Sequence, residues 1–273
     1  MIRRDLLSIV SPSDSGGLVY AEGIEEDGMI LAGKARSPAT GETYEIKNGY
    51  LDLLKARISA ANVANLTNFL PGAGRGYEPL WRVRALSLLT GESFPNEREL
   101  EIITDLVRPV HGVRYLDLGC SAGLYTRSLA RAIEDGDAVG IDISPSMLRE
   151  AVRRSSGLGA RPSFIRASAM NLPFIDASFA GAVCGGSLNE FGDPARVLRE
   201  TRRVLEPGGR LAIMGILRAG TSGGRRLQRV LSIGGLKFFD PDELQSLLDH
   251  AGFEPDALRR HGTVFFAGGA SRT

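Results

Sequence analysis

The chain has 273 residues, of which 43% are hydrophobic and 24% charged, and its 33 basic and 32 acidic side chains leave a formal charge of +1. That balance excludes a global attraction to nucleic acid or to a membrane surface. The two cysteines, Cys120 and Cys184, are too few for a disulfide framework, and no stretch reaches the ~20 apolar residues of a membrane span or has the form of a signal peptide. We therefore expect a cytoplasmic protein without a membrane partner.

Three regions follow one another along the chain, and we treat them as three domains. Residues 1–55 contain short β-like runs separated by Gly and Pro, and residues 56–110 show helical spacing of apolar residues. Residues 111–273 alternate apolar strands with amphipathic helices. This last pattern predicts βαβ units around a parallel sheet, so the predicted fold class is α/β with helices on both faces.

The elements expected in the second and third regions can be given by residue number. Helices are expected over residues 60–69, 81–89 and 95–107 of the second region. The third region predicts strands near 113–118, 137–142, 162–166, 179–185 and 209–216, and helices near 123–134, 145–155, 194–205 and 241–251. Residues 255–260 and 263–267 predict a terminal hairpin.

A glycine-containing turn follows the first strand of the third region. Gly119 and Gly123 would let the backbone approach a ligand closely at a helix N-terminus. Asp142 ends the next strand, where such folds place an acid that accepts hydrogen bonds from a ribose diol. A tight turn without a ligand is the alternative, and the presence of Asp117 and Asp142 beside the glycines argues against it.

The same turn indicates what kind of ligand is bound. The spacing from Gly119 to Gly123 lacks the glycines of the dinucleotide motif G-x-G-x-x-G. A carboxylate at Asp117 would repel a pyrophosphate but suits an ammonium group. We therefore expect a nucleoside that carries an amino acid and no phosphates.

Five segments in order complete a resemblance to a known family. They are residues 116–123 (LDLGCSAG), 140–147 (GIDISPSM), 171–174 (NLPF), 203–211 (RVLEPGGRL) and 248–253 (LDHAGF). From about residue 113 to 267 the chain resembles a class I S-adenosylmethionine (SAM) methyltransferase of the ubiquinone-biosynthesis-like type. The resemblance implies a Rossmann-like seven-stranded sheet with an antiparallel last strand. It also implies SAM as methyl donor and S-adenosylhomocysteine as product.

The resemblance carries cofactor-binding roles onto matching positions. For the methionine end of SAM it implies Asp117, Gly119, Cys120 and Gly123. For the ribose it implies Asp142, and for the adenine it implies Ile143 and Met147. The family usually has Asp-Ala after the third strand, whereas this chain has Ser168-Ala169. Ser168 accepts a hydrogen bond without charge, so we expect adenine binding to be weaker by roughly 1 kcal/mol. The backbone N–H of Ala169 or Met170 can still meet a ring nitrogen. Cys120 is interpreted as a small residue that fills the turn, not as a nucleophile.

The first region resembles the zinc ribbon that precedes certain methyltransferases. Its four ligand positions would be Ser11, Asp14, Ser37 and Thr40, where the ribbon has two Cys-x-x-Cys pairs. Hydroxyls and one carboxylate do not make the thiolate site that zinc requires, so we expect no metal.

The segment Tyr77-Glu78-Pro79-Leu80-Trp81-Arg82 resembles one found in chloroplast, cyanobacterial and actinobacterial relatives. In class I enzymes this region folds over the donor as a lid. Tyr77, which we count among the cofactor-binding residues, and Arg82 are therefore candidates for contact with the SAM carboxylate or the acceptor. Trp81 is expected to anchor a helix on the core.

The loop after the fourth strand, residues 185–191, should border the methyl group, with Gly185 against the cofactor. Glu190 and Asn189 are its carboxylate and its amide, and either could orient or deprotonate an acceptor. We take Glu190 as the candidate base; the alternative is that it caps the following helix. The three histidines are poorly placed to act as a base. Residues 217–239, rich in glycine around Arg225 and Arg226, are interpreted as a mobile insertion over the acceptor pocket.

These observations favour a methyltransferase that acts on a small molecule of secondary metabolism at O, N or C. Methyl transfer from a sulfonium depends mainly on holding the reactants in line, and a base is needed only for some acceptors. An rRNA guanine methyltransferase is the first alternative, because bacterial enzymes of that class share the ribbon architecture. The balanced charge and the missing cysteines argue against a nucleic-acid partner. A SAM-fold cyclase or binding protein is the second alternative. The sequence leaves the acceptor and the oligomeric state open.

Overall fold

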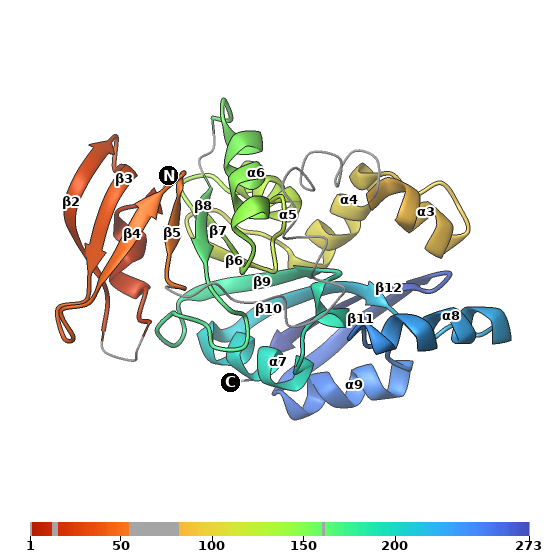
Figure 1. The fold of residues 1–273 in the computed structure, drawn as a ribbon. Helices are drawn as coiled ribbons and strands as arrows, with labels where there is room; N and C mark the ends of the chain where they lie inside the picture. The colour runs from red at the N-terminus through yellow and green to blue at the C-terminus, as the bar shows by residue number, and fades with distance from the viewer. Residues whose placement is uncertain (1, 13–15, 55–81, 160–161, 273) are drawn as a thin grey trace.

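The structure is a computed structural model that describes residues 2–12, 16–54, 82–159 and 162–272 (Figure 1). Its centre is a twelve-stranded sheet. Eleven of the strands follow the order β1-β3-β4-β5-β8-β7-β6-β9-β10-β12-β11, and the twelfth, β2, pairs with β3. The expected helix over residues 60–69, Trp81 and Tyr77 lie outside the described residues.

The strands of the third region occupy one half of the sheet. They are β6 (Arg114–Leu118), β7 (Asp137–Asp142), β8 (Ser163–Arg166), β9 (Phe179–Gly185), β10 (Leu205–Ile216), β11 (Phe253–His261) and β12 (Val264–Ser271). The strands β8, β7, β6, β9 and β10 run parallel, and β12 runs antiparallel between β10 and β11. The predicted strands and the terminal hairpin are present. β10 begins earlier than predicted, because Leu205 already pairs with Phe179 before a shift in register.

Helices cover both faces of this half of the sheet (Figure 1). On one face lie α3 (Val83–Thr90), α4 (Asn96–Val107), α5 (Leu124–Ala132) and α6 (Pro145–Ser155), and on the other lie α7 (Pro194–Val204) and α9 (Pro241–His250). The helix starts follow from local sequence, since the Ser144 and Asp193 side chains cap the α6 and α7 amides, and Asp240 and Glu243 form a capping box on α9.

The core consists of apolar side chains on the two faces of the strands. Alternate residues of β6 show the division, because Tyr115 packs with the α4 and α5 side chains while Leu116 packs with those of α7 and α9. α4 belongs to the region expected to form a connector and lid, and its Ile103, Leu106 and Val107 are buried against the sheet. It is therefore a layer of the core.

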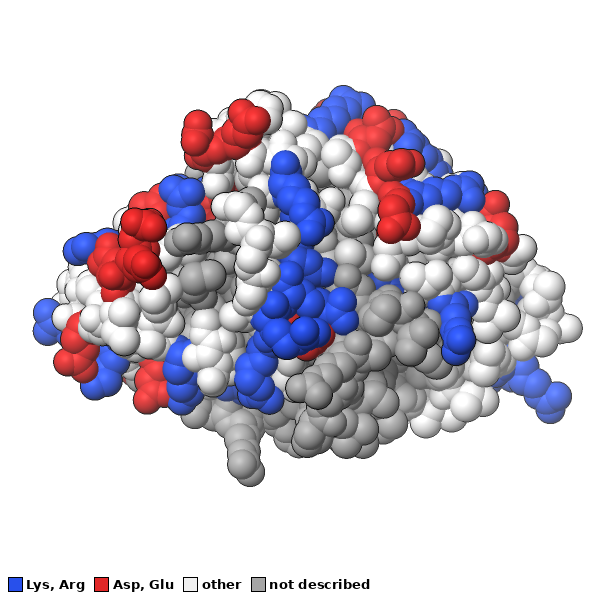
Figure 2. Space-filling view, turned by 90° about the horizontal axis from the view of Figure 1, so that it is seen from above, with Lys and Arg blue, Asp and Glu red and all other residues white. Residues whose placement is uncertain are grey.

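The first region continues the same sheet. It contains β1 (Ile2–Arg3), the 3-10 helix η1 (Asp5–Ile9), β2 (Val19–Glu26), β3 (Met29–Arg36), β4 (Thr43–Lys47) and β5 (Tyr50–Asp52). β5 pairs in parallel with β8, with Leu51 opposite Ile165. The expected seven-stranded sheet is thus only part of a larger one, because the N-terminal strands extend it at the β8 edge. At the left of Figure 2 these strands carry acidic and basic side chains interspersed.

The positions that correspond to zinc ligands in a ribbon have other roles where the structure describes them. The Ser37 hydroxyl accepts a hydrogen bond from the Thr40 amide at 3.3 Å, which closes a turn between β3 and β4. Ser11 is buried, and Asp14 lies outside the described residues. Within the described ranges no three His, Cys, Asp or Glu side chains form a group that could hold a metal ion.

The insertion between β10 and α9 contains a helix that the sequence analysis did not predict, α8 (Ser222–Ile233). The Thr221 side chain caps it by accepting from the Gly224 amide. Figure 1 shows α8 at the right-hand edge of the molecule, extending away from the body. In the part of the chain that the structure covers, no helix is long and apolar enough to cross a membrane.

Candidate cofactor and active site

The predicted glycine turn lies at the carboxyl end of β6. Gly119 and Gly123 have φ values of 64° and 78°, in the left-handed region that side chains rarely adopt. A Cβ atom at Gly119 would lie 2.5 Å from the Ser187 Oγ, and one at Gly123 would lie 3.0 Å from the Ala151 Cβ. The turn therefore requires glycine both for its backbone angles and for close packing against its neighbours.

Asp117 is buried two residues before this turn. Its Oδ2 accepts hydrogen bonds from the Thr126 amide at 2.9 Å and from the Thr126 hydroxyl at 2.6 Å. Burial raises the pKa of Asp117 to about 6, although the Thr126 bonds and the charge of Arg82 act in the opposite direction. A buried carboxylate whose charge is only partly compensated is suited to bind a cationic group.

Asp142 ends β7, the strand next to β6. Its two oxygens accept separate backbone hydrogen bonds, Oδ2 from the Ser121 amide at 2.9 Å and Oδ1 from the Ser144 amide at 2.8 Å. Burial raises the pKa of the Asp142 carboxyl, and these amides oppose that shift. Since each carboxylate oxygen has two acceptor positions, the fixed carboxylate can still accept from a diol.

The residues expected around an adenine follow β7 and β8. Met147 is buried on α6, and the Ile143 carbonyl accepts from the Arg166 guanidinium at 3.1 Å. The Ser168 hydroxyl accepts from the Met170 amide at 3.3 Å, so it shapes the turn after β8. Ala169 is buried and Met170 is partly exposed.

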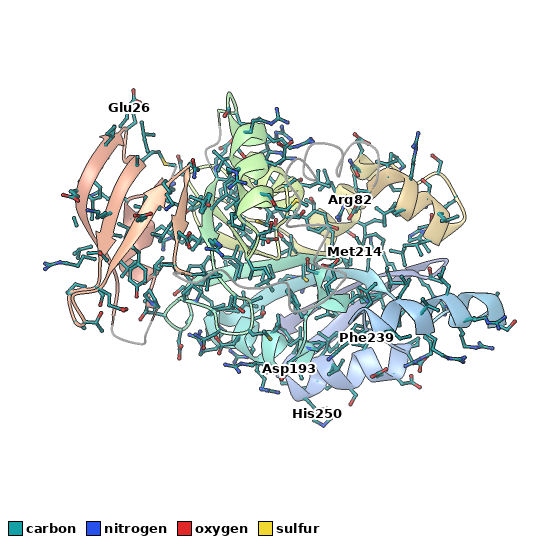
Figure 3. The ribbon with its side chains drawn as sticks, viewed as in Figure 1. Glu26, Arg82, Asp193, Met214, Phe239 and His250 are labelled. Carbon is teal, nitrogen blue, oxygen red and sulfur yellow. The ribbon has the colours of Figure 1, made fainter. Side chains whose placement is uncertain are left out.

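The structure adds a buried ion pair that the sequence analysis did not identify. Arg82 binds Glu99 with two nitrogens, at 2.5 Å and 3.2 Å, and the Tyr125 hydroxyl also donates to Glu99. Arg82 lies over the Tyr125 ring and 3.5 Å from the carbonyl of Gly185. Figure 3 shows Arg82 between the α3–α4 layer and the end of β10 marked by Met214. The available signal was Glu99, an acid on the apolar face of a predicted helix.

Gly185 itself ends β9 beside this pair. A Cβ atom there would come within 2.6 Å of the Tyr125 ring, so only glycine allows Tyr125 to pack against the strand. Arg82 and Glu99 therefore reach the same sheet edge as Asp117 and Gly185.

Asn189 is the last residue of the short helix η4 (Ser187–Asn189) after β9, and Glu190 follows it. The two side chains have different roles. The Asn189 amide nitrogen donates to the carbonyls of Ile216 and Lys237, and its oxygen accepts from the Ile216 amide. This side chain is 1% exposed and joins the two ends of the α8 insertion. Of the two residues considered for contact with an acceptor, Asn189 is thus occupied by structural hydrogen bonds.

Glu190 is half-buried at the same edge. Burial and the nearby Asp142 charge raise the pKa of Glu190 to about 7, while Arg82 acts to lower it. The alternative that Glu190 caps the following helix is wrong, because Asp193 caps α7 by accepting from the Arg196 amide. A carboxyl with a pKa near neutrality has the property that a general base needs.

The cysteines and two of the histidines occupy positions that do not suit a nucleophile or a base. Cys120 and Cys184 are buried, and burial raises the pKa of each thiol, which keeps them protonated. His250 lies on the outer side of α9, away from Arg82 in Figure 3. His261 packs edge-on against Phe94 in the terminal hairpin.

Comparisons with known proteins agree with this arrangement. Residues 116–213 match the family model described as a methyltransferase domain. A demethylmenaquinone methyltransferase of Thermotoga maritima is 31% identical over 56% of this chain and 75% of its own. An O-methyltransferase of Aspergillus nomiae is 35% identical over 58% of this chain and 72% of its own. The crystal structure of the [4+2]-cyclase SpnF shares the fold, with a TM-score of 0.58, 21% identity, and coverage of 73% of this chain and 95% of that one.

The fold and the sheet edge define a Rossmann-like methyltransferase domain. With relatives at this identity and coverage, the chain belongs to the class I SAM-dependent methyltransferases.

Proposed function

We propose that this protein transfers the methyl group of SAM to a small-molecule acceptor, in the manner of the secondary-metabolite methyltransferases among its relatives. The observation that carries the proposal is the pair of carboxylates, the buried Asp117 and the half-buried Asp142, at the ends of adjacent strands beside a turn that only glycine permits. By their names, one of the relatives given above methylates demethylmenaquinone and the other is an O-methyltransferase. Both names support a small acceptor over a macromolecule.

The residues at this edge fit SAM part by part. Asp117 would accept from the ammonium group, the Gly119 and Gly123 backbone would border the methionine chain with Cys120, and Asp142 would accept from the ribose hydroxyls. The adenine would lie against a set of side chains and amides from the turns after β7 and β8, namely Ile143, Met147, Ser168, Ala169 and Met170. Gly185 would border the sulfur end, and Tyr77 remains a proposed contact outside the described residues.

The protein's main catalytic task in this reaction is to place the acceptor in line with an already activated methyl group. SAM supplies that group, and S-adenosylhomocysteine leaves as the acceptor bond forms. Glu190 would hold or remove the acceptor proton, because its carboxyl has a pKa of about 7 and shares the edge with Asp142 and Arg82. For an acceptor that carries no acidic proton, the same carboxylate would orient it by a hydrogen bond.

We also propose that residues 1–55 are a metal-free relative of a zinc ribbon, that residues 56–110 are a connector and lid in which α4 is the part packed on the sheet, and that residues 111–273 are the catalytic domain with its seven-stranded sheet. The hydroxyl side chains at Ser11, Ser37 and Thr40 support the first point. Stoichiometric zinc in the purified protein would contradict it.

The experiment that tests the function has two stages. Calorimetric titration with SAM and with S-adenosylhomocysteine should show saturable binding of both at one site per chain. Incubation with SAM and a panel of phenolic, amine and quinol acceptors should then release S-adenosylhomocysteine only when an accepted compound is present. If the protein binds SAM and converts a compound of the panel without methylating it, the result would instead indicate a cyclase. Release dependent on rRNA would indicate the ribosomal alternative.

A further inference from the structure

The helix α8 presents apolar side chains to solvent. None of its twelve residues is buried, and Leu227, Val230, Leu231 and Ile233 are between 40% and 86% exposed. Leu227, Val230 and Leu231 are spaced three and four residues apart, so they lie on one side of the helix. A continuous apolar stripe on an exposed helix is typical of a surface that binds something.

The side of α8 that lies next to Leu231 attaches the helix to the body. The Gln228 side chain accepts from the Ala219 amide at 2.8 Å and donates to the Leu217 carbonyl at 2.9 Å. Gly224 packs closely on Ala219 on the same side, one helical turn earlier. The helix is therefore attached to the body through polar and small residues beside Leu231. Leu227 and Val230, which lie farther from this attachment, are 61% and 62% exposed, against 40% for Leu231.

The charge on α8 itself is of one sign. Arg225, Arg226 and Arg229 lie on α8, and the sequence from Arg218 to Phe239 contains no acid. A short helix with an apolar stripe and only basic charges has the composition of a helix that lies in the plane of an anionic membrane surface. The overall charge of +1 led us to expect no membrane partner, but a surface senses charge only within a Debye length of about 10 Å.

Other occupants fit this surface less well. A second copy of the chain would bring the same three arginines together across a two-fold axis, and four side chains fall short of the roughly 800 Å² per partner of a stable interface. A small molecule would need a concave site, whereas α8 projects from the body (Figure 1).

We propose that α8 docks on the surface of an anionic lipid bilayer, with Leu227, Val230 and Leu231 in the headgroup boundary and the arginines on lipid phosphates. The two ends of the insertion are joined to the Asn189 side chain, next to Glu190. A docked α8 would thus place the rim of the candidate active site at the membrane.

Vesicle flotation of the full chain tests this proposal, with vesicles of phosphatidylcholine alone and with vesicles that also contain the anionic lipid phosphatidylglycerol. We expect binding to the anionic vesicles that is lost at 0.5 M salt (a Debye length of about 4 Å). The variants Leu227→Ser/Val230→Ser and Arg225→Gln/Arg226→Gln/Arg229→Gln should each bind at least about tenfold less.

Matched controls come from the far end of the molecule, where Ile24 is 63% exposed. Ile24→Ser and Arg36→Gln/Lys34→Gln/Lys47→Gln should bind vesicles as the wild type does. All variants should keep the wild-type affinity for SAM, which separates this test from that of the proposed function. Equal binding to neutral and anionic vesicles would overturn the proposal. So would wild-type binding by the Leu227/Val230 variant, or a concentration-dependent dimer that this variant abolishes.

Discussion

Asp142 is the residue with the most directly testable role. Replacing it with alanine would remove the proposed acceptor of two ribose hydrogen bonds, and we expect SAM affinity to fall by roughly 2 kcal/mol, about thirtyfold. Calorimetry measures the change. Because Asp142 also binds the amides of Ser121 and Ser144, thermal unfolding should be followed in parallel. Asp105→Ala, on the exposed side of α4, is the control and should leave the affinity unchanged. Wild-type affinity in a folded Asp142→Ala protein would contradict the ribose assignment.

Glu190 makes a prediction about pH. A base acts as the carboxylate, so turnover should rise as pH increases through about 7, the value to which burial raises the pKa of Glu190. Glu190→Gln should bind SAM normally and should lose both the turnover and its pH dependence. The measurement is the initial rate of S-adenosylhomocysteine release between pH 5.5 and 8.5. A Glu190→Gln enzyme with an unchanged rate and pH profile would show that no base acts here.

Among the elements, the junction between β5 and β8 links the N-terminal strands to the cofactor edge. Arg166 on β8 binds both carboxylate oxygens of Asp52 at 3.1–3.2 Å, the carbonyl of Leu54 at 2.8 Å and the carbonyl of Ile143. One guanidinium therefore connects β5 with the turn proposed to hold the adenine.

Asp52→Asn should leave the buried Arg166 without its ionic partner. We expect a loss of about 2–3 kcal/mol in the free energy of unfolding, less than for a fully buried pair because Asp52 is partly exposed. SAM affinity should weaken as well, through the Ile143 turn. Denaturant unfolding and calorimetry measure the two effects. Lys34→Gln, which removes an exposed ion pair in the same sheet, should change neither. An Asp52→Asn protein of wild-type stability would show that the junction does not depend on this pair.

The sequence predicted the elements that depend on local signals, but not the contacts between distant segments. Apart from α8, the strands and helices of residues 111–273 were predictable because apolar periodicity, caps and turns are local, and Ser144, Asp193 and Gly119 show each of these signals. The pairing of β5 with β8 was not predictable, since a parallel pair between distant segments leaves no local pattern. For the same reason, the Arg82–Glu99 pair and the Asn189 bonds to both ends of the insertion became visible only in three dimensions.

The stability of the whole molecule should depend on pH through Asp137. This residue begins β7 at the sheet edge opposite the candidate site and is 3% exposed, and burial raises the pKa of its carboxyl to about 7. The Asp137 Oδ2 is buried without a hydrogen-bond partner. Between pH 4 and 7 the unfolded chain releases this proton and the folded protein retains it, so folding stability should fall across that range and remain lower above it.

Asp137→Asn removes the titration and keeps the shape. The variant should therefore be more stable than the wild type at pH 8, by an amount on the order of 2–4 kcal/mol, and the difference should shrink toward pH 4. Denaturant midpoints measured at half-unit steps would show it. Asp135→Asn, two residues earlier and exposed, is the control and should follow the wild-type curve. Parallel pH curves for the Asp137 variant and the wild type would contradict the assignment.

The pairing of β5 with β8 also sets an order of events during synthesis. The partners Asp52 and Arg166 are 114 residues apart in the chain, so β5 has an unpaired border until β8 has emerged from the ribosome. Contacts between such distant segments form slowly, and an exposed strand border in the meantime can recruit other nascent chains. We therefore expect the early strands to need a chaperone's protection until β8 is made.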